Sequence, residues 1–415
     1  MSNVKASIIT IGDELLIGQT IDTNSAWIAK HLNEIGIDVL RRVAVGDDAD
    51  AIRNALDEEL DRADLILITG GLGPTADDIT KPLLCDYFGG KLIVDENVLA
   101  HVKALLAKRK RLFLERNLKQ AEVPDNCIAL HNTIGSAPGM WFEKEAKVVV
   151  AMPGVPFEMT DIMEHEVLPR LRQHFISDAI VHVSIITAGE AESVIAENIQ
   201  DIEANLPAHI KLAYLPSPGI VKLRLTGKGK AKDLLFEELS IWQGRIANRL
   251  GEIIVALEDL PLENILGKAL LQNGIKLGLA ESCTGGYIAH LITQVPGASE
   301  YFSGGIVCYQ NDVKNGVLRV PQLTIDEQGA VSEETAAEMA KNAINVLNCD
   351  ISLSVTGMLG PGAYDGVPVG TVWMAIAGSG RIMTKKFHFH YDRIRNKEMA
   401  AQMGMLMVWK FLNNK

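Results

Sequence analysis

Short apolar runs alternate with amphipathic segments over residues 1–170. The apolar runs predict strands over residues 7–12, 37–45, 64–69 and 148–151. Apolar positions at helical spacing predict helices over residues 23–35 and 49–62 and from about residue 78 onward. Run 64–69 is nearly all apolar, as in a central parallel strand that is covered on both faces. This alternation predicts a doubly wound α/β domain.

The pattern changes after residue 170. Residues 171–250 predict a small α+β module with strands over 180–187, 210–215 and 221–226 and helices over 190–205 and 232–250. Residues 251–263, centred on Asp259-Leu260-Pro261, are predicted to be a linker. Residues 264–415 predict a second α/β domain, with strands over 275–280, 305–309, 351–355, 369–377 and 383–389. Its predicted helices cover residues 262–272, 287–294 and 332–347.

Composition limits the partners that the chain can have. The formal net charge is −12, which argues against sequence-independent nucleic-acid binding because that needs a basic surface. No apolar run approaches the ~20 residues that span a bilayer, and the first residues lack the apolar core of a signal peptide. The five cysteines are odd in number and lack CxxC spacing. We therefore expect a cytoplasmic protein with free thiols, no membrane partner and no nucleic-acid partner.

The segment Glu281-Ser282-Cys283-Thr284-Gly285-Gly286 stands between a predicted strand and a predicted helix. A helix N-terminus offers backbone N–H groups to an anion or to a developing oxyanion. A serine nucleophile needs a base, and Lys314 can serve if burial lowers its pKa, with Tyr309 as a polarising or relaying hydroxyl. The alternative is a phosphate-binding turn without covalent chemistry. Cys283 is a rival nucleophile, although a small thiol buried under the turn is the favoured interpretation.

Carboxylates cluster beside the expected strand ends of the first domain: Asp13, Glu14, Asp22, Asp77 and Asp78. Together with the bare backbone of loop 69–74 they predict a divalent metal beside a phosphate group. Asp22 and Asp78 can instead be helix caps. A basic run (Lys108, Arg109, Lys110, Arg111, Arg116 and Lys119) is interpreted as a solvated helix face, and the pair His388 and His390 as solvent-facing.

Several long motifs resemble the CinA family of competence/damage-inducible proteins. GDELLIGQTIDTNSAWIA (12–29), TGGLGPTADDIT (69–80), RNLKQAEVP (116–124) and PGVPFEM (153–159) are similar to its molybdopterin-binding-like domain. AESCTGG (280–286), GGIVCYQNDVK (304–314), GAVS (329–332), VTGMLGP (355–361) and PVGTV (368–372) are similar to its nicotinamide-nucleotide amidase domain. The middle module resembles a KH-type fold, without a convincing GxxG nucleic-acid loop.

The resemblance implies that the C-terminal domain hydrolyses nicotinamide mononucleotide to the acid and ammonia, without a cofactor. The nucleophilic serine falls on Ser282, the general-base lysine on Lys314 and the assisting tyrosine on Tyr309. Substrate-binding positions fall on Glu281, Thr284, Gly285, Gly286, Gly305, Thr356 and Gly357, and on Arg393 or Arg395 for the phosphate. The run Gly357–Asp365 has fewer glycines than the family usually shows, and its Tyr364 and Asp365 are expected to narrow the pocket.

For the N-terminal domain the resemblance implies a pyrophosphatase acting on ADP-ribose with a divalent metal, Mg²⁺ or Co²⁺. Its metal ligands fall on Asp13, Asp22 and Asp78, and its diphosphate contacts on Gly70, Gly71, Gly73 and Lys119. The alternative is a pterin- or nucleotide-binding scaffold without catalysis, because fold alone does not fix function. The resemblance also implies a homodimer.

Overall fold

The computed structural model describes residues 4–75, 78–114, 117–175, 178–362 and 366–413. The chain forms two compact units. The first holds Met1–Val181 with Gly227–Phe236, and the second holds His182–Thr226 with Glu237–Lys415. In the described part of the chain, no helix is both long enough and apolar enough to cross a membrane.

A six-stranded sheet forms the centre of the N-terminal domain, in the order β2-β1-β3-β8-β7-β6. Its strands are β1 (Lys5–Ile11), β2 (Asp38–Val45), β3 (Leu65–Thr69), β6 (Ile128–Leu130), β7 (Gly139–Lys144) and β8 (Lys147–Met152). The first four in this order are parallel, and β7 and β6 are antiparallel. All five residues of β3 are buried, as predicted for a central strand.

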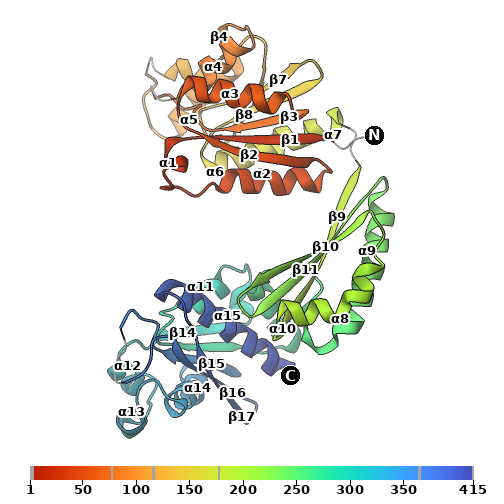
Figure 1. Cartoon of the computed structure of the whole chain (residues 1–415). Helices are drawn as coiled ribbons and strands as arrows, with labels where there is room; N and C mark the ends of the chain where they lie inside the picture. Colours follow the sequence, from red (N-terminus) through yellow and green to blue (C-terminus); the bar gives the residue numbers. More distant parts are fainter. Residues whose placement is uncertain (1–3, 76–77, 115–116, 176–177, 363–365, 414–415) are drawn as a thin grey trace. The chain divides into compact units, whose positions relative to one another are not determined.

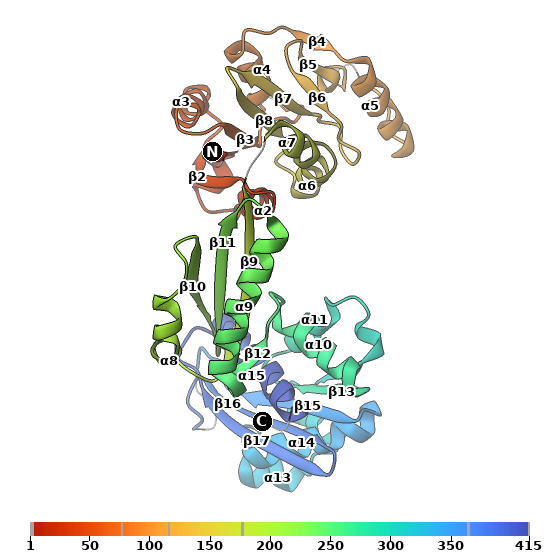
Figure 2. The same cartoon turned by 90° about the vertical axis from the view of Figure 1, so that its right-hand side faces the viewer.

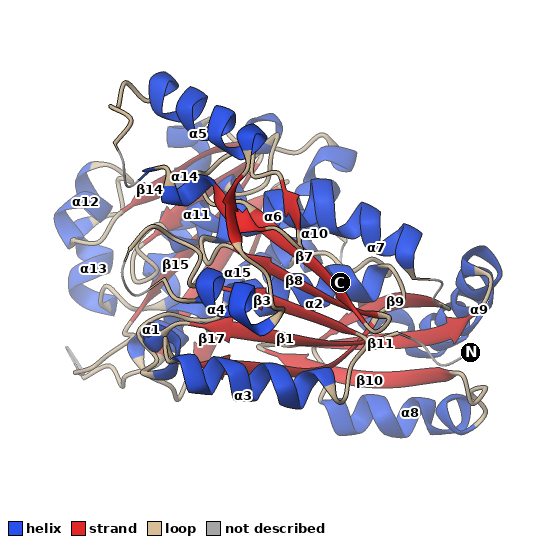
Figure 3. Ribbon diagram, turned by 90° about the horizontal axis from the view of Figure 1, so that it is seen from above, coloured by secondary structure: helices blue, strands red, loops and turns tan. Residues whose placement is uncertain are grey.

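Helices cover both faces of this sheet, which confirms the doubly wound α/β prediction (Figure 1). One core joins α2 (Thr23–Glu34), α6 (Pro156–Ile162) and α7 (Leu168–His174) to the sheet. The other core joins α3 (Ala49–Leu60) and α4 (Thr80–Tyr87) to the opposite face. Figure 3 shows α3 running along β1. The remaining elements are α1 (Asp13–Leu16), α5 (Glu96–Lys108) and the two-stranded ribbon β4 (Leu92–Val94) and β5 (Glu122–Pro124).

The middle module is a four-stranded sheet in the order β10-β11-β9-β12 with two helices. Its elements are β9 (Ala179–Ala188), α8 (Glu192–Ala204), β10 (Ile210–Ser217), β11 (Ile220–Gly229), α9 (Lys232–Leu250) and β12 (Ile254–Ala256). Strand β12 lies inside the segment predicted to be a linker, so that prediction is wrong for these residues. The reason is apolar burial, because Val255 packs into the same core as Ile186 and Leu262.

The C-terminal domain has a five-stranded sheet in the order β14-β13-β15-β16-β17. The strands are β13 (Leu277–Glu281), β14 (Phe302–Val307), β15 (Ile351–Gly357), β16 (Thr371–Gly378) and β17 (Arg381–His388). Helix α14 (Glu333–Leu347) lies on one face, and α10 (Leu262–Asn273) and α15 (Arg393–Leu412) lie on the other (Figure 2). The short helices are α11 (Tyr287–Thr293), α12 (Asn311–Gly316) and α13 (Gln322–Gln328). The predicted pairing of the last two strands is confirmed.

Candidate active sites

A cavity of about 270 Å³ opens at the carboxyl ends of β13 and β15. It is lined by Ser282, Cys283, Tyr309, Gln310, Asn311, Lys314, Ala330, Val331, Thr356, Gly357, Met358, Leu359 and Arg393. Six residues predicted from the sequence therefore come together here, from four separate chain segments: Ser282, Tyr309, Lys314, Thr356, Gly357 and Arg393. This placement follows the rule that sites of open α/β sheets lie beyond the carboxyl ends of the strands.

The turn that carries Ser282 has a defined backbone. The Ser282 N–H donates to the carbonyl of Val355 at 2.9 Å, which fixes the turn to the end of the neighbouring strand. Gly285 and Gly286 have φ values of +62° and +89°, a left-handed conformation that favours glycine. The two glycines thus let the chain turn from β13 into α11 with Ser282 facing the cavity.

Glu281 has a role that the sequence did not show. Its buried carboxylate accepts the backbone N–H groups of Gly286 at 3.1 Å, Ile288 at 3.1 Å and Ala289 at 2.8 Å. The N–H groups that we expected to meet a ligand anion therefore bind the chain's own carboxylate, and Glu281 does not line the cavity. The expectation of a free helix N-terminus at this turn is corrected accordingly.

Two further predicted substrate contacts, Thr284 and Gly305, are not among the lining residues. Thr284 is buried, and its Oγ1 has no hydrogen-bond partner among the residues that the structure describes. Gly305 faces Ala289 and Leu279, where an added Cβ would lie 3.4 Å and 3.5 Å from their Cβ atoms. Gly305 is an exposed position of β14, and these would be ordinary van der Waals contacts. A substrate contact of either residue stays a prediction.

Lys314 is the buried cation of this cavity. Its side chain begins in α12, the residue is 2% exposed, and its Nζ lies 3.5 Å from the carbonyl oxygen of Tyr309. Burial lowers the pKa of the Lys314 ammonium from its ordinary 10.5, against the opposing effect of the Cys308 and Cys283 thiols. No carboxylate of the described residues is among the groups that shift this pKa, so the neutral amine becomes accessible at lower pH than for an exposed lysine.

Cys283 lines the cavity but is a poor nucleophile. Burial raises the pKa of its thiol to about 12, so the thiol is protonated near neutral pH. The raised pKa agrees with the favoured interpretation of a small buried residue beside the nucleophile. Cys308 is buried nearby, and burial raises its pKa to about 11.

Arg393 is the arginine that reaches the cavity. Its Nη2 donates to the Tyr309 hydroxyl at 2.8 Å, and its Nη1 donates to the carbonyl of Gly360. Arg395 instead pairs with Glu398 at 3.0 Å and does not line the cavity. Of the two arginines that the sequence offered for the substrate phosphate, Arg393 lines the cavity and Arg395 does not. Tyr364 and Asp365, expected to narrow this pocket, lie outside the described residues.

A second cavity, of about 480 Å³, opens in the N-terminal domain at the carboxyl ends of β1, β3 and β8. Five of its lining residues are glycines, which leave the backbone bare: Gly12, Gly70, Gly71, Gly73 and Gly154. The three glycines predicted to contact a diphosphate are among them. Its acidic side chains are Glu14, Asp47, Asp78 and Glu158.

The three predicted metal ligands are not brought together. Asp78 lines the cavity, but its carboxylate accepts the N–H groups of Gly73 at 2.7 Å and Thr75 at 2.8 Å. Asp22 caps α2 by accepting the N–H of Ser25 at 2.9 Å. Asp13 accepts the N–H of Asp47 at 3.3 Å. Over the residues placed in the structure there is no group of three or more His, Cys, Asp or Glu side chains able to hold a metal ion.

The carboxylates that line this cavity fit a metal that is held partly by the protein and partly by the substrate. Magnesium commonly binds through one or two carboxylates plus substrate phosphates rather than through a full protein cage. Glu14, Asp47 and Asp78 supply such carboxylates, so the chemistry of the donors fits a divalent ion that arrives with a diphosphate. Asp77, which the sequence placed in this cluster, lies outside the described residues.

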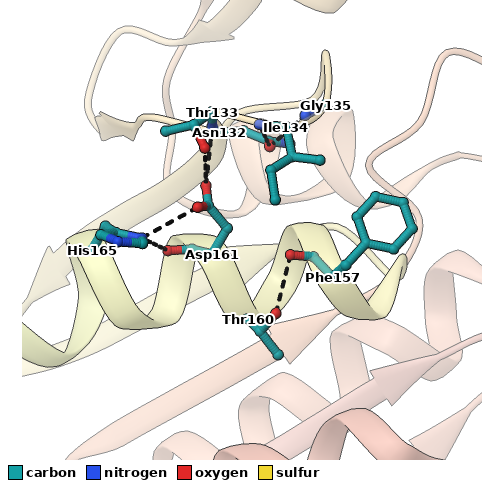
Figure 4. Close-up of polar contacts among 8 residues, drawn as sticks. All are labelled: Asn132, Thr133, Ile134, Gly135, Phe157, Thr160, Asp161 and His165. Atoms are coloured by element: carbon teal, nitrogen blue, oxygen red, sulfur yellow. Dashed lines mark hydrogen bonds and ion pairs between the residues drawn. The ribbon is translucent and has the colours of Figure 1, made fainter. Parts of the chain in front are cut away.

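The loop that leads to the lining residues Ser136 and Ala137 is bonded to helix α6 (Figure 4). Thr133 donates its N–H and its hydroxyl to Asp161 at 3.1 Å and 2.8 Å, and Asp161 also contacts His165 at 3.2 Å. In the same loop, Nδ2 of Asn132 donates to Glu158 at 2.7 Å. These bonds hold the Glu158 carboxylate at the edge of the cavity.

Comparison with known proteins identifies the chain. Residues 7–173 match the family described as probable molybdopterin binding domain, residues 183–256 the damage-inducible protein CinA KH domain, and residues 259–412 the CinA C-terminal domain. A CinA-like protein of Flavobacterium psychrophilum is 43% identical over 410 residues, which is 98% of each chain. The chain belongs to the CinA family.

A second relative is similar over almost the whole chain. A putative competence-damage inducible protein of Caldicellulosiruptor bescii is 39% identical over 406 residues, 98% of each chain. A solved structure titled as the protein CinA with unknown function, from Thermoplasma acidophilum, is 35% identical over 42% of this chain and 99% of its own, with a TM-score of 0.37.

Several residues that the sequence singled out in this CinA family member do not line either cavity. Lys119 is exposed, and its backbone carbonyl accepts Nζ of Lys81 at 2.9 Å. The described part of the basic run is exposed, as interpreted from the sequence: Lys108, Arg109, Lys110 and Arg111, with Arg116 outside the described residues. His388 and His390 are exposed, and their rings meet edge to face with centroids 4.6 Å apart.

Sequence reasoning missed two carboxylates that line the N-terminal cavity, Asp47 and Glu158. Asp47 could have been found, because it follows a predicted strand as Asp13 does.

Proposed function

We propose that the C-terminal domain hydrolyses the carboxamide of nicotinamide mononucleotide, giving nicotinic acid mononucleotide and ammonia. The observation that carries the proposal is that Ser282 and the buried, carboxylate-free Lys314 line one cavity of about 270 Å³. A serine hydroxyl becomes a nucleophile only beside a base, and burial is what makes a lysine a base near neutral pH.

The proposed reaction has two halves. Neutral Lys314 takes the proton of the Ser282 hydroxyl while Oγ attacks the carboxamide carbon and forms a tetrahedral oxyanion. The C–N bond then breaks, Lys314 returns the proton to the leaving nitrogen, and ammonia departs from an acyl ester on Ser282. Water, deprotonated by Lys314, hydrolyses that ester and releases the carboxylic acid. Each step is an acyl or proton transfer, so the proposal assigns no cofactor to this domain.

The proposed base predicts how activity depends on pH. Only the neutral amine of Lys314 accepts a proton, and the neutral form predominates above its lowered pKa. We therefore expect kcat/KM for nicotinamide mononucleotide to rise with pH and to level off below 10.5, the ordinary lysine pKa. Initial rates of ammonia release between about pH 5 and about pH 10 measure this rise of kcat/KM with pH. A profile that falls with rising pH, or that bends only near the ordinary pKa, contradicts neutral Lys314 as the base.

For the N-terminal domain we propose a pyrophosphatase that cleaves ADP-ribose into AMP and ribose 5-phosphate. The support is the cavity of about 480 Å³ with backbone walls at Gly70, Gly71 and Gly73, which lets phosphates approach main-chain N–H groups closely. One or two of the carboxylates of Glu14, Asp47 and Asp78 would hold the divalent ion, Mg²⁺ or Co²⁺, which when bound would supply positive charge to the diphosphate. The chain would act as a cytoplasmic homodimer with these nucleotides as partners.

The alternative for this domain is a pterin- or nucleotide-binding scaffold without turnover. The observation that favours it is the lack of a three-ligand metal group among the described residues. Incubation of the full chain with ADP-ribose and Mg²⁺ or Co²⁺ separates the two proposals. Release of AMP and ribose 5-phosphate eliminates the scaffold, whereas tight ADP-ribose binding without products eliminates the pyrophosphatase.

Asp78 predicts a measurable effect on ligand binding by this domain. Asp78→Asn replaces one acceptor oxygen by an NH₂ group that faces the N–H groups of Gly73 and Thr75, so the glycine loop loses its present geometry. We expect the affinity for ADP-ribose to fall at least about tenfold, or about 1.4 kcal/mol. Calorimetry with Asp61→Asn, an exposed carboxylate away from the cavity, is the matched control. Equal affinities of the two variants for ADP-ribose would show that Asp78 does not contribute to ligand binding by the glycine loop.

A further inference from the structure

Tyr309 contacts two different parts of the C-terminal cavity at once. Its hydroxyl accepts from Arg393 Nη2 at 2.8 Å, while its backbone carbonyl lies 3.5 Å from Lys314 Nζ. Tyr309 is 54% exposed, whereas Lys314 is 2% exposed. Tyr309 therefore connects the cation Arg393 with the proposed base Lys314. A ligand that binds to Arg393 can change the position of Tyr309 next to Lys314.

Arg393 is the permanently charged group among the described lining residues. Lys314 is buried with a lowered pKa, whereas a guanidinium stays protonated at all relevant pH values. A guanidinium is the side chain best suited to bind a phosphate through paired hydrogen bonds. The proposed substrate carries one phosphate, so Arg393 is where its dianion would bind.

Two of the five N–H donors of Arg393 are already engaged before a phosphate arrives. Nη1 donates to the carbonyl of Gly360 and Nη2 donates to the phenolic oxygen of Tyr309. A phosphate oxygen is a charged acceptor and forms a stronger hydrogen bond than a neutral phenol. The phosphate therefore competes with the Tyr309 hydroxyl for Nη2, and the exposed phenol is the easier partner to displace.

We propose that the Arg393–Tyr309 hydrogen bond is a phosphate-operated latch that lets the enzyme distinguish a nucleotide from a nucleoside in the chemical step. Binding of the substrate phosphate to Arg393 releases the Tyr309 hydroxyl, which then closes on the substrate next to Lys314. The phosphate thus contributes to kcat and not only to binding. The latch rests on the proposed amidase function.

Phosphite supplied separately from the substrate tests the latch kinetically. Nicotinamide riboside has the carboxamide but no phosphate, and the phosphite dianion can occupy the phosphate position. We expect phosphite to raise kcat/KM for nicotinamide riboside at least about tenfold in the wild-type chain and by less than about twofold in Tyr309→Phe. Activation of equal size in both proteins, or no activation in a wild-type chain that hydrolyses the mononucleotide, overturns the latch. A wild-type chain that releases no ammonia from the mononucleotide overturns the proposed function instead.

A second measurement does not depend on activity. 3-Fluorotyrosine placed at position 309 in the Ser282→Ala chain reports on the phenol by ¹⁹F NMR. Titration with ribose 5-phosphate is expected to shift this resonance, and Arg393→Lys, which keeps the charge but loses the paired donors, is expected to remove the shift. An unmoved resonance at saturating ribose 5-phosphate overturns the latch, even where Tyr309→Phe is inactive with both substrates.

Discussion

Replacing Ser282 by alanine is expected to reduce ammonia release from nicotinamide mononucleotide by at least about a thousandfold, or about 4 kcal/mol. The physical reason is that alanine has no oxygen to form the acyl ester, so Lys314 has no proton to accept. The change is small, and the turn is held by main-chain bonds such as Ser282 N–H to Val355 at 2.9 Å, which alanine keeps. Thermal unfolding of the variant should therefore resemble that of the wild-type chain.

Ser303→Ala is the matched control for this substitution. Ser303 is an exposed serine in β14 and does not line the cavity, so its removal should leave the rate unchanged. A loss of only about tenfold in Ser282→Ala, about 1.4 kcal/mol, argues against a nucleophile, because removing one usually costs far more. An unchanged rate in Ser282→Ala eliminates the covalent mechanism.

Replacing Lys314 by methionine is expected to change activity and stability in opposite directions. Activity should fall by about a hundredfold to ten-thousandfold, the range that a general base supplies. Stability should rise, because folding lowers the pKa of Lys314 and so disfavours its protonated form. A lysine with a lowered folded pKa costs stability below its unfolded pKa, and this cost shrinks as pH rises from the lowered pKa toward 10.5.

The stabilisation by Lys314→Met should therefore be largest at acidic and neutral pH and small near pH 10. Urea unfolding at several pH values measures it, with Lys341→Met as control because Lys341 lies at a helix surface and its side chain is 48% exposed. If Lys314→Met loses activity together with several kcal/mol of stability, Lys314 is needed for folding, and the loss of activity does not identify it as the base. Full activity in Lys314→Met would show that another group is the base.

The fold followed from the sequence where periodicity was strong. The buried run of β3 and the paired strands β16 and β17 were predicted closely because apolar continuity and alternation are local signals. Strand β12 was missed because three apolar residues in a segment that resembles a linker do not show what they pack against. Strand β14 begins and ends earlier than predicted, so Tyr309 lies beyond it, where its side chain can reach Arg393.

The candidate sites were predictable to different degrees. The C-terminal residues Ser282, Lys314 and Arg393 come from different segments, and the rule about strand ends placed only the first of them. Glu281 was assigned to the substrate because a sequence does not show that its carboxylate turns back onto N–H groups five to eight residues ahead. In the N-terminal domain the same carboxylate pattern fits a cap or a metal ligand. Asp22 is a cap, which only its hydrogen bond to Ser25 reveals.

The central claim is that Ser282 and Lys314 form an amidase without a cofactor. The most direct measurement is product analysis of the full chain, treated with EDTA, after incubation with nicotinamide mononucleotide. We expect ammonia and nicotinic acid mononucleotide in equal amounts from the wild-type chain, and neither product from Ser282→Ala. The absence of ammonia from the wild-type chain, or equal ammonia release by Ser282→Ala, would contradict it.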